Sequence, residues 1–233
     1  MKDPEHPYVG RGGLKLEHAL KAFNLDVSGL NCADLGCSTG GFTDCLLQHG
    51  AASVVSVDTA YGELAWKLRS DDRVTVSERM NALHAEPDEP VDLVVLDLSW
   101  TPQRLALPAA AKWLNETGRI ISLVKPHYEL TDAEKDALPA RGVLDEADAE
   151  RVVERVMNDV RAMGFDVLGV TKSPILGGAN AAKARRAATP NGSPSCAQKA
   201  PATDRPPRAL EEKARLHGRY RQRLGRSHPR CFG

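Results

Sequence analysis

The sequence has no apolar run that approaches the roughly 18 residues of a membrane-spanning helix. It begins with the polar stretch Met1-Lys-Asp-Pro-Glu-His6, which does not resemble a secretory signal peptide. These absences predict a cytoplasmic protein that does not contact a membrane.

Cysteine is scarce and irregularly spaced. The five cysteines are an odd number and none forms a C-x-x-C pair, so they indicate neither a disulfide framework nor a zinc site. We therefore expect no bound metal. Those near the glycine-rich segment are expected to be small buried thiols; the full set is Cys32, Cys37, Cys45, Cys196 and Cys231.

The net charge is zero, with 31 Lys or Arg and 31 Asp or Glu, but the two signs are unevenly distributed. Residues 179–233 hold 13 basic and 3 acidic residues, a net charge of +10, which leaves 18 basic and 28 acidic residues, or −10, for residues 1–178. The last part is also rich in Ala, Pro, Ser and Arg. We predict an acidic globular domain over 1–178 and a basic, disordered tail over 179–233.

Within residues 1–178, short apolar runs alternate with amphipathic stretches, an order typical of a parallel sheet with crossover helices. The clearest predicted helix is 146–163, where apolar residues recur at three- and four-residue spacing and Gly164 follows as a C-cap. An earlier helix over 14–23 precedes the first strand. The predicted fold class is α/β, a mainly parallel sheet with helices on both faces and strands at Asn31–Leu35, Ala52–Val57, Val74–Ser77, Val91–Leu96, Ile120–Val124 and Asp166–Val170.

A glycine-rich loop, Asp34-Leu-Gly-Cys-Ser-Thr-Gly-Gly-Phe42, follows the first predicted strand. Glycines lack a Cβ atom, so such a backbone can approach a nucleotide-like ligand closely. The spacing is not G-x-G-x-x-G, because Ser38 takes the second glycine position, and no G-K-[ST] follows. A nicotinamide dinucleotide and a P-loop are therefore disfavoured. The candidate cofactor contacts in this loop are Asp34, Gly36, Ser38, Thr39, Gly40 and Gly41.

Asp58 lies near the end of the second predicted strand, 22 residues after Gly36. An acidic side chain at this place can accept hydrogen bonds from both ribose hydroxyls of an adenosine. With the loop, it predicts S-adenosylmethionine as the cofactor. A tight turn and a solvated aspartate are the alternative interpretation.

Two charged residues follow apolar strands at positions where open α/β sheets hold ligands. Asp97 ends the run Asp92-Leu-Val-Val-Leu-Asp97, and Lys125 ends Ile121-Ser-Leu-Val-Lys125. We expect them to face each other across the methyl group of the cofactor, with Lys15 as a second cation. The alternative is that both lysines are ordinary surface residues.

The sequence after the fourth strand limits the methyl acceptor. Amino groups of bases are usually methylated with a [DN]-P-P-[FY] loop, which here reads Asp97-Leu-Ser-Trp100, and the Pro-Cys nucleophile of carbon methylation is absent. A hydroxyl acceptor remains, and it needs a base. A lysine can serve if burial or a nearby cation lowers its pKa from about 10.4, so Lys125 is the candidate base and Asp97 orients it.

These motifs resemble those of the haemolysin A-type (TlyA) ribosomal RNA methyltransferases, which belong to the FtsJ-like 2'-O-methyltransferases. The similarity covers about residues 8–178. It is carried by YVGRGGLKLE (8–17), DLGCSTGGFTDCL (34–46), VDTAYGELAWKL (57–68), ERMN (78–81), LDLS (96–99) and LVKPHYE (123–129).

The resemblance implies a Rossmann-like S-adenosylmethionine-dependent methyltransferase fold. It implies a ribose 2'-hydroxyl of ribosomal RNA, in a subunit or free, as the acceptor. FtsJ-like enzymes use a Lys-Asp-Lys-Glu tetrad, whose first three members match Lys15, Asp97 and Lys125. The cofactor contacts that the resemblance implies are Gly40, Phe42, Asp58, Asn81 and Asp97.

The chain departs from the family pattern in several places. Gly10 and Tyr128 stand where the family usually has serine and phenylalanine, and the small N-terminal RNA-binding domain common in the family does not precede Tyr8. After Gly178 the family continues with an N-x-E-[FY] strand that supplies the fourth catalytic residue, and this motif is not found. We therefore expect the final antiparallel strand to be missing and interpret the tail as a replaced or frame-altered C-terminus.

Two other functions are compatible with the sequence. A catalytically impaired RNA- or S-adenosylmethionine-binding protein, whose basic tail contacts RNA phosphates, would fit the missing glutamate. A membrane-lytic haemolysin is disfavoured, because residues 1–178 contain no spanning or strongly amphipathic basic helix.

Overall fold

The computed structural model describes residues 6–136, 144–175 and 194–195. Its main sheet has five parallel strands in the order β3-β2-β1-β4-β5. The chain moves outward from β1 to β3 and then returns past β1 to form β4 and β5, so the direction reverses between β1 and β4. Ligands of such sheets bind at this reversal point. The strands are β1 (Asn31–Leu35), β2 (Ser53–Asp58), β3 (Val74–Glu78), β4 (Val91–Leu96) and β5 (Leu114–Ser122).

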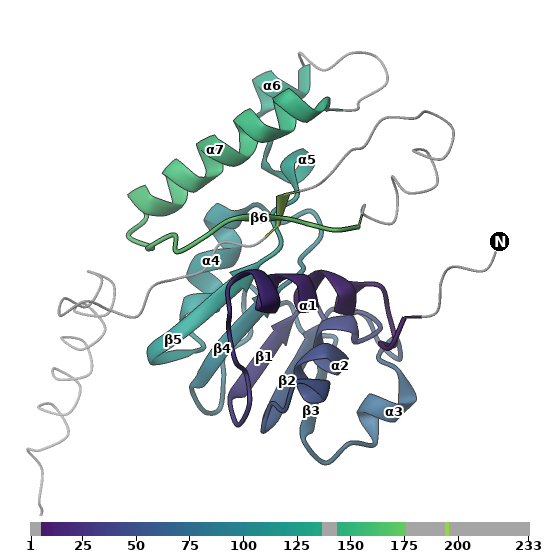
Figure 1. The fold of residues 1–233 in the computed structure, drawn as a ribbon. Coiled ribbons are helices and arrows are strands. Elements are labelled where there is room, and N and C mark those ends of the chain that lie inside the picture. The colour runs from purple at the N-terminus through teal and green to yellow at the C-terminus, as the bar shows by residue number, and fades with distance from the viewer. Residues whose placement is uncertain (1–5, 137–143, 176–193, 196–233) are drawn as a thin grey trace, which may run out of the picture. The chain divides into compact units, whose positions relative to one another are not determined.

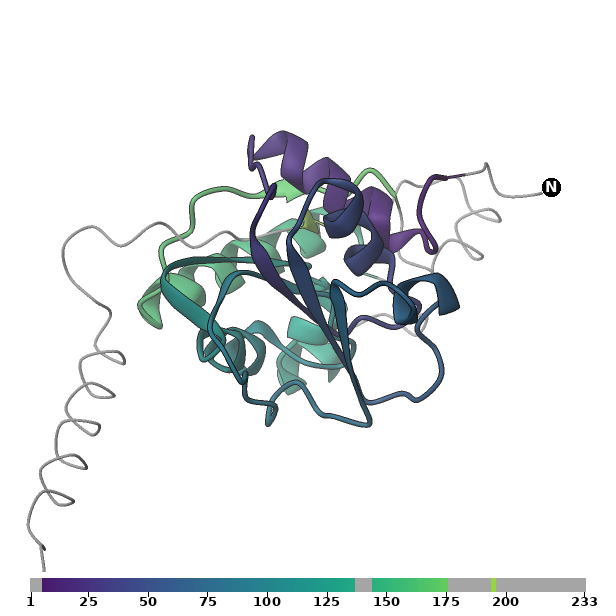
Figure 2. The ribbon, with the colours of Figure 1, turned by 90° about the horizontal axis from the view of Figure 1, so that it is seen from below.

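Helices cover both faces of the sheet (Figures 1 and 2). Alternate residues of each strand point to opposite faces, so Leu93 and Val95 pack with one helical layer and Val94 and Leu96 with the other. The first layer contains α1 (Gly12–Ala22), α2 (Gly41–Gln48) and α3 (Trp66–Arg69); the second contains α4 (Gln103–Ala111) and α7 (Glu146–Ala162). Two short helices, α5 (Pro126–Glu129) and α6 (Asp132–Asp136), follow β5.

Most predicted elements are confirmed. β1 and β4 have the predicted bounds, β2 is shifted by one residue at each end, and β3 ends one residue later than predicted. Helix α7 forms as expected, and Gly164 follows it with a left-handed φ of 87°. β5 begins at Leu114, earlier than predicted. The prediction missed its first half, Leu-Asn-Glu-Thr-Gly, because these residues lack the apolar pattern of a buried strand.

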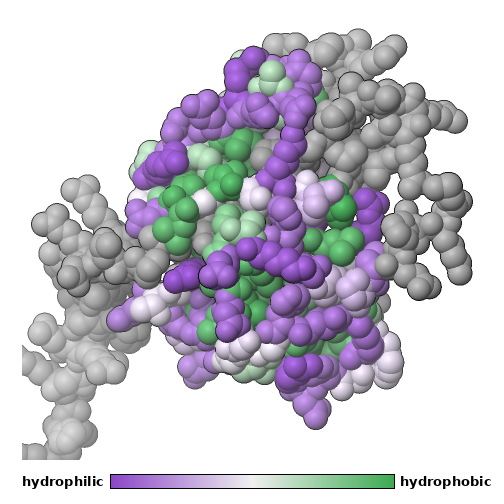
Figure 3. Space-filling model, viewed as in Figure 1, coloured by the Kyte–Doolittle hydropathy of each residue, from purple (hydrophilic) through white to green (hydrophobic). Residues whose placement is uncertain are grey.

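The predicted sixth strand, Asp166–Val170, is wrong. These residues form no strand, although Phe165 and Val167 pack against the core while Leu168 and Val170 are each 46% exposed. The apolar residues of this segment correctly indicated partial burial, but a strand also needs a hydrogen-bonding neighbour, which the side chains do not specify. Figure 3 shows apolar residues on the molecular face between α7 and α1, where this segment runs.

A separate two-stranded antiparallel sheet joins β6 (Thr171–Lys172) to β7 (Pro194–Ser195). β7 is the part of the predicted tail that the structure describes, and the rest of 179–233 lies outside the described residues. Three cysteines, Cys32, Cys37 and Cys45, are free, buried thiols as expected. Over the described ranges, no helix combines the length and apolarity that crossing a membrane requires.

Candidate active site

Three charged side chains meet at the carboxyl ends of β4 and β5. Asp97 directly follows β4, and Lys125 Nζ lies 2.6 Å from Asp97 Oδ1. Lys15, on α1, places its Nζ 3.5 Å from Asp97 Oδ2. The Asp97 side chain is 22% exposed, Lys15 14% and Lys125 23%, so each group is largely desolvated but can be reached from outside. One carboxylate thus holds two amines at the edge of the sheet.

Lys125 is held in place by more than its ion pair. Its Nζ also donates a hydrogen bond of 3.1 Å to the Leu98 carbonyl and lies 5.7 Å from the ring centroid of Tyr128. The Tyr128 ring packs on Trp100, with 4.8 Å between centroids. Trp100 is 82% exposed and has a positive φ of 60°, which is uncommon for a bulky residue. An exposed aromatic face therefore adjoins the Lys125 amine.

The glycine-rich loop turns sharply where β1 ends. Gly36 and Gly40 have φ values of 95° and 94°, in the left-handed region that glycine adopts without strain. A Cβ atom at Gly36 would lie 3.1 Å from the Asp97 carbonyl oxygen, so the loop touches the end of β4. The loop backbone and Asp97 therefore border the same space.

Asp58 fastens this loop to the end of β2. Its Oδ2 accepts a 2.8 Å hydrogen bond from the backbone N–H of Ser38, and its Oδ1 accepts one of 2.8 Å from Ala60. Each carboxylate oxygen retains a further lone pair. Asp58 can therefore hold the loop and still accept hydrogen bonds from a ligand's hydroxyls.

Asp34 is completely buried at the end of β1. Its Oδ2 accepts hydrogen bonds from the N–H and the hydroxyl of Thr43, at 2.9 and 2.7 Å, while Oδ1 has no hydrogen-bond partner among the described residues. Burial raises the pKa of Asp34 to about 7, and the negative charges of Asp97 and Asp58 add to this effect. A buried carboxylate oxygen without a partner among these residues, near two further carboxylates, favours the protonated form of Asp34.

The pKa of Asp34 predicts a pH dependence of stability. Because the folded protein favours the protonated carboxyl, Asp34 contributes stability that is fully present below about pH 4 and is lost as the pH rises to about 7. Asp34→Asn cannot titrate. Between about pH 5 and pH 7, the unfolding free energy of wild type, relative to this variant, should fall by about 2–3 kcal/mol in chemical denaturation. Parallel pH profiles would contradict this prediction.

The segment before α1 crosses the glycine-rich loop at close range. A Cβ atom at Gly41 would lie 3.0 Å from Gly13 N and 3.2 Å from the Gly10 carbonyl oxygen, so these backbones can approach only because the residues are glycines. The Val9 N–H also donates to Asp44 Oδ2 at 2.7 Å. This packing fixes the start of α1 and brings Lys15 to Asp97.

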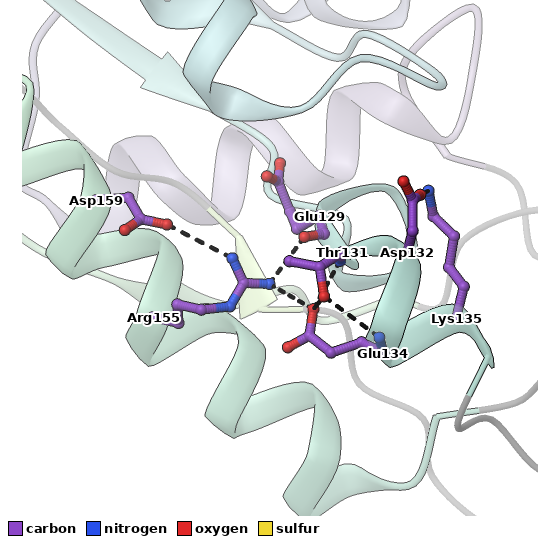
Figure 4. A network of polar contacts seen from close by, with 7 residues as sticks. All are labelled: Glu129, Thr131, Asp132, Glu134, Lys135, Arg155 and Asp159. Atoms are coloured by element: carbon purple, nitrogen blue, oxygen red, sulfur yellow. Dashed lines mark hydrogen bonds and ion pairs between the residues drawn. The ribbon is translucent and has the colours of Figure 1, made fainter.

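Glu129 joins the two loops that carry Asp97 and Lys125. Its Oε1 accepts a 2.9 Å hydrogen bond from the N–H of Gln103, the first residue of α4, and Gln103 Oε1 accepts one of 2.6 Å from the Ser122 hydroxyl. In Figure 4 the carboxylate of Glu129 points away from Arg155, whose Nη2 donates instead to the Glu129 carbonyl at 2.8 Å. Burial raises the pKa of Glu129, and the Gln103 N–H opposes this shift.

We expect Glu129→Ala to lower the unfolding free energy by about 1–2 kcal/mol, because the first N–H of α4 loses its buried acceptor. Glu129→Gln keeps a carbonyl oxygen at this position and should remain near wild type. Urea denaturation of both variants tests the point, and equal loss in the two would mean that the hydrogen bond is unimportant.

Comparisons with known proteins support the same interpretation of the chain. The model of the FtsJ-like methyltransferases matches residues 8–184. The chain belongs to the FtsJ-like methyltransferase family. A Mycobacterium tuberculosis relative named 16S/23S rRNA (cytidine-2'-O)-methyltransferase TlyA is 42% identical over 180 residues, which are 76% of this chain and 66% of that protein.

Solved structures agree with this FtsJ-like assignment. A Streptococcus thermophilus protein named for the hemolysins is 36% identical, with a TM-score of 0.74 over 96% of this chain and 79% of that one. An S-adenosylmethionine-dependent methyltransferase from Mesorhizobium loti, 20% identical, has a TM-score of 0.57 over 82% of this chain and all of that one, which shows a shared fold. The predicted Rossmann-like methyltransferase fold is confirmed.

Three predicted cofactor contacts of this FtsJ-like chain have partners within the protein. Phe42 is buried, and a Cβ atom at Gly12 would lie 3.4 Å from its ring, so Phe42 packs under α1. Asn81 is exposed, and its side-chain oxygen accepts a hydrogen bond from Leu83 N at 3.0 Å. Thr39 is exposed, and its carbonyl accepts a 3.1 Å bond from Ala65. The predicted place of the fourth tetrad member, after Gly178, lies outside the described residues.

Sequence reasoning missed Trp100 and the Glu129–Gln103 connection. A tryptophan three residues after Asp97 is one available signal, because it stands beside a predicted charged site in the sequence. Gln103, a buried polar residue at the start of an apolar helix, is another.

Proposed function

We propose that the protein is an S-adenosylmethionine-dependent methyltransferase that modifies ribose 2'-hydroxyls of ribosomal RNA. The observation that carries this proposal is the pairing of Lys15 and Lys125 with Asp97 at the edge of the sheet where the glycine-rich loop ends. The rRNA and ribose specificity is inferred from the activity for which the Mycobacterium tuberculosis relative is named; this chain spans 66% of the length of that relative.

The pocket residues fit this cofactor. When bound, S-adenosylmethionine supplies a methyl group activated by a positively charged sulfur. Asp58 is available to its ribose hydroxyls, because each of its carboxylate oxygens keeps a further lone pair. The glycines of the loop let it pack closely against Asp97 and the start of α1, which brings the loop next to Lys15 and Asp97.

Lys125 is proposed as the general base. Its Nζ would accept the proton that the ribose hydroxyl loses. Asp97 and the Leu98 carbonyl orient this nitrogen at 2.6 and 3.1 Å. One carboxylate faces two amines, so Lys15 is a second cation beside Asp97 and Lys125.

The exposed pair of Trp100 and Tyr128 supports a nucleotide acceptor. Sequence-independent recognition of single-stranded RNA relies on bases that stack on aromatic side chains. A base on the exposed face of Trp100 would place its ribose in the neighbourhood of Lys125, which contacts Tyr128.

Transfer of radiolabelled methyl groups to ribosomal subunits that lack the modification tests the proposal. We expect label in the RNA, within dinucleotides that resist alkaline hydrolysis, because a methylated 2'-oxygen cannot attack the adjacent phosphate. Absence of label, or label confined to bases, would contradict the proposal.

A further inference from the structure

We propose that the ends of β2 and β3 carry a second stacking surface, which binds single-stranded RNA beside the nucleotide being methylated. This aromatic surface consists of Tyr61, Trp66 and Arg79. The inference rests on the proposed function and deepens it, because it names the part of the protein that holds the flanking RNA.

The two aromatic rings are exposed to an unusual degree. Trp66 is 81% exposed and Tyr61 69%, and Met80 beside Arg79 is 42% exposed. The nearby Leu64 and Leu68 are each 2% exposed. The segment therefore buries its leucines, while both aromatic rings remain outside the core. Large aromatic side chains left outside such an interior are typical of a surface that another molecule covers.

Hydrogen bonds hold this exposed segment rigidly. Glu78, at the end of β3, accepts a 2.9 Å hydrogen bond from Gly62 N and forms an ion pair with Arg69. Arg79 N donates to the Ala60 carbonyl at 3.2 Å. A rigid surface loses little conformational entropy when a ligand binds.

Arg79 combines a cation with an aromatic face. Its guanidinium lies 4.2 Å from the centroid of the Tyr61 ring, and its φ of 54° is in the left-handed region. Strained backbone of this kind persists where the surrounding structure requires it, often at binding sites. The guanidinium can stack on a base or pair with a phosphate while it remains on the ring.

The aromatic surface is continuous with the cofactor loop. Ala65 N donates to the Thr39 carbonyl at 3.1 Å, and a Cβ atom at Gly40 would lie 2.7 Å from Leu64. All five strands are parallel, so the ends of β2 and β3 lie at the same edge as Asp97 and Lys125. With strands about 4.8 Å apart, the ends of β2 and β5 are separated by ~14 Å, about four stacked nucleotides.

These features favour single-stranded RNA over other partners. Two π-faces with an arginine match the chemistry of bases and phosphates without sequence specificity. Lys67, next to Trp66, is 55% exposed, but its Nζ pairs with Asp44 Oδ2 at 2.9 Å, so Arg79 is the main cation of this surface. Glu63 is an exposed acidic residue of the same loop. In an acidic domain, local cations and stacking are what would attract a polyanion.

The test measures the affinity of Trp66→Ala and Tyr61→Ala for a short unstructured RNA by fluorescence anisotropy. Each variant should raise the Kd about tenfold, the loss expected for one stacked base. With ribosomal subunits, KM should rise while kcat at saturation stays near wild type. Leu168→Ala, which truncates an exposed apolar residue outside the aromatic surface, is the matched control and should bind like wild type.

Several outcomes would overturn the proposal. The proposed RNA-binding surface would be contradicted if both variants bound RNA as tightly as wild type. It would also be contradicted if wild type bound no RNA. Weaker S-adenosylmethionine binding with unchanged RNA affinity assigns the rings to the cofactor pocket. Loss of affinity for whole subunits alone assigns them to a ribosomal protein. If wild type transfers no methyl group but the variants still lose RNA affinity, the proposed function fails and the RNA surface stands.

Discussion

Lys125→Ala should lower the rate of methyl transfer to ribosomal RNA by about 10²–10⁴-fold, the usual contribution of a general base. The variant leaves Asp97 paired with Lys15 at 3.5 Å, so the pocket keeps one balancing cation. We therefore expect the fold and the affinity for S-adenosylmethionine to change little. Single-turnover rates with labelled donor, together with a donor-binding titration, separate the two effects.

Lys125→Arg is the decisive companion variant. Arginine keeps the positive charge and can donate to Asp97 and the Leu98 carbonyl, but it does not lose its proton under these conditions. If Lys125 is the base, this variant should be nearly as slow as Lys125→Ala. A rate above about one tenth of wild type would show that Lys125 contributes only its positive charge and does not accept the proton.

Gly36→Ala should lower the affinity for S-adenosylmethionine at least about tenfold and reduce the unfolding free energy by about 2–3 kcal/mol. Gly36 has a φ of 95°, and a Cβ atom would lie 3.0 Å from Leu98 Cδ2 and 3.1 Å from the Asp97 carbonyl oxygen. The methyl group would thus strain the loop and push against the end of β4. Equilibrium dialysis and chemical denaturation measure the two losses.

Gly29→Ala separates backbone strain from crowding. Gly29 has a similar left-handed φ of 74°, but a Cβ atom there meets no described atom within 4 Å. This control should lose about 1 kcal/mol of stability and bind the donor as wild type does. If both variants bind the donor equally well, the loop's close approach to Asp97 is unimportant for the pocket.

The sequence was sufficient to predict the parallel sheet and several charged residues at the carboxyl ends of its strands. Buried parallel strands are largely apolar runs, so β4 could be located to the residue, whereas β1 was located by the glycine-rich loop that follows it. Parallel strands also end at one edge, which is why Asp58, Asp97 and Lys125 could be expected near one another. That Lys15 joins Asp97 depends on α1 packing against α2, and its position in the family motif was the available clue.

Other parts of the site depend on tertiary contacts that no local pattern encodes. Glu129 and Gln103 are 26 residues apart, and only the packing of α5 beside the start of α4 joins them. The stacking of Arg79 on Tyr61 requires β2 and β3 to pair in their observed register, with Asp58 opposite Glu78. The prediction of a strand over 166–170 was wrong for the same reason, because apolar side chains indicate burial but do not identify a strand with which to form hydrogen bonds.

Equilibrium dialysis of the purified chain against radiolabelled S-adenosylmethionine tests the central claim most directly. The account predicts saturable uptake of one molecule per chain, with a Kd in about the micromolar to submillimolar range and weaker uptake by Asp58→Ala. No saturable uptake by wild type, or uptake that Asp58→Ala leaves unchanged, would contradict the assignment of this sheet edge as a methyl-donor pocket.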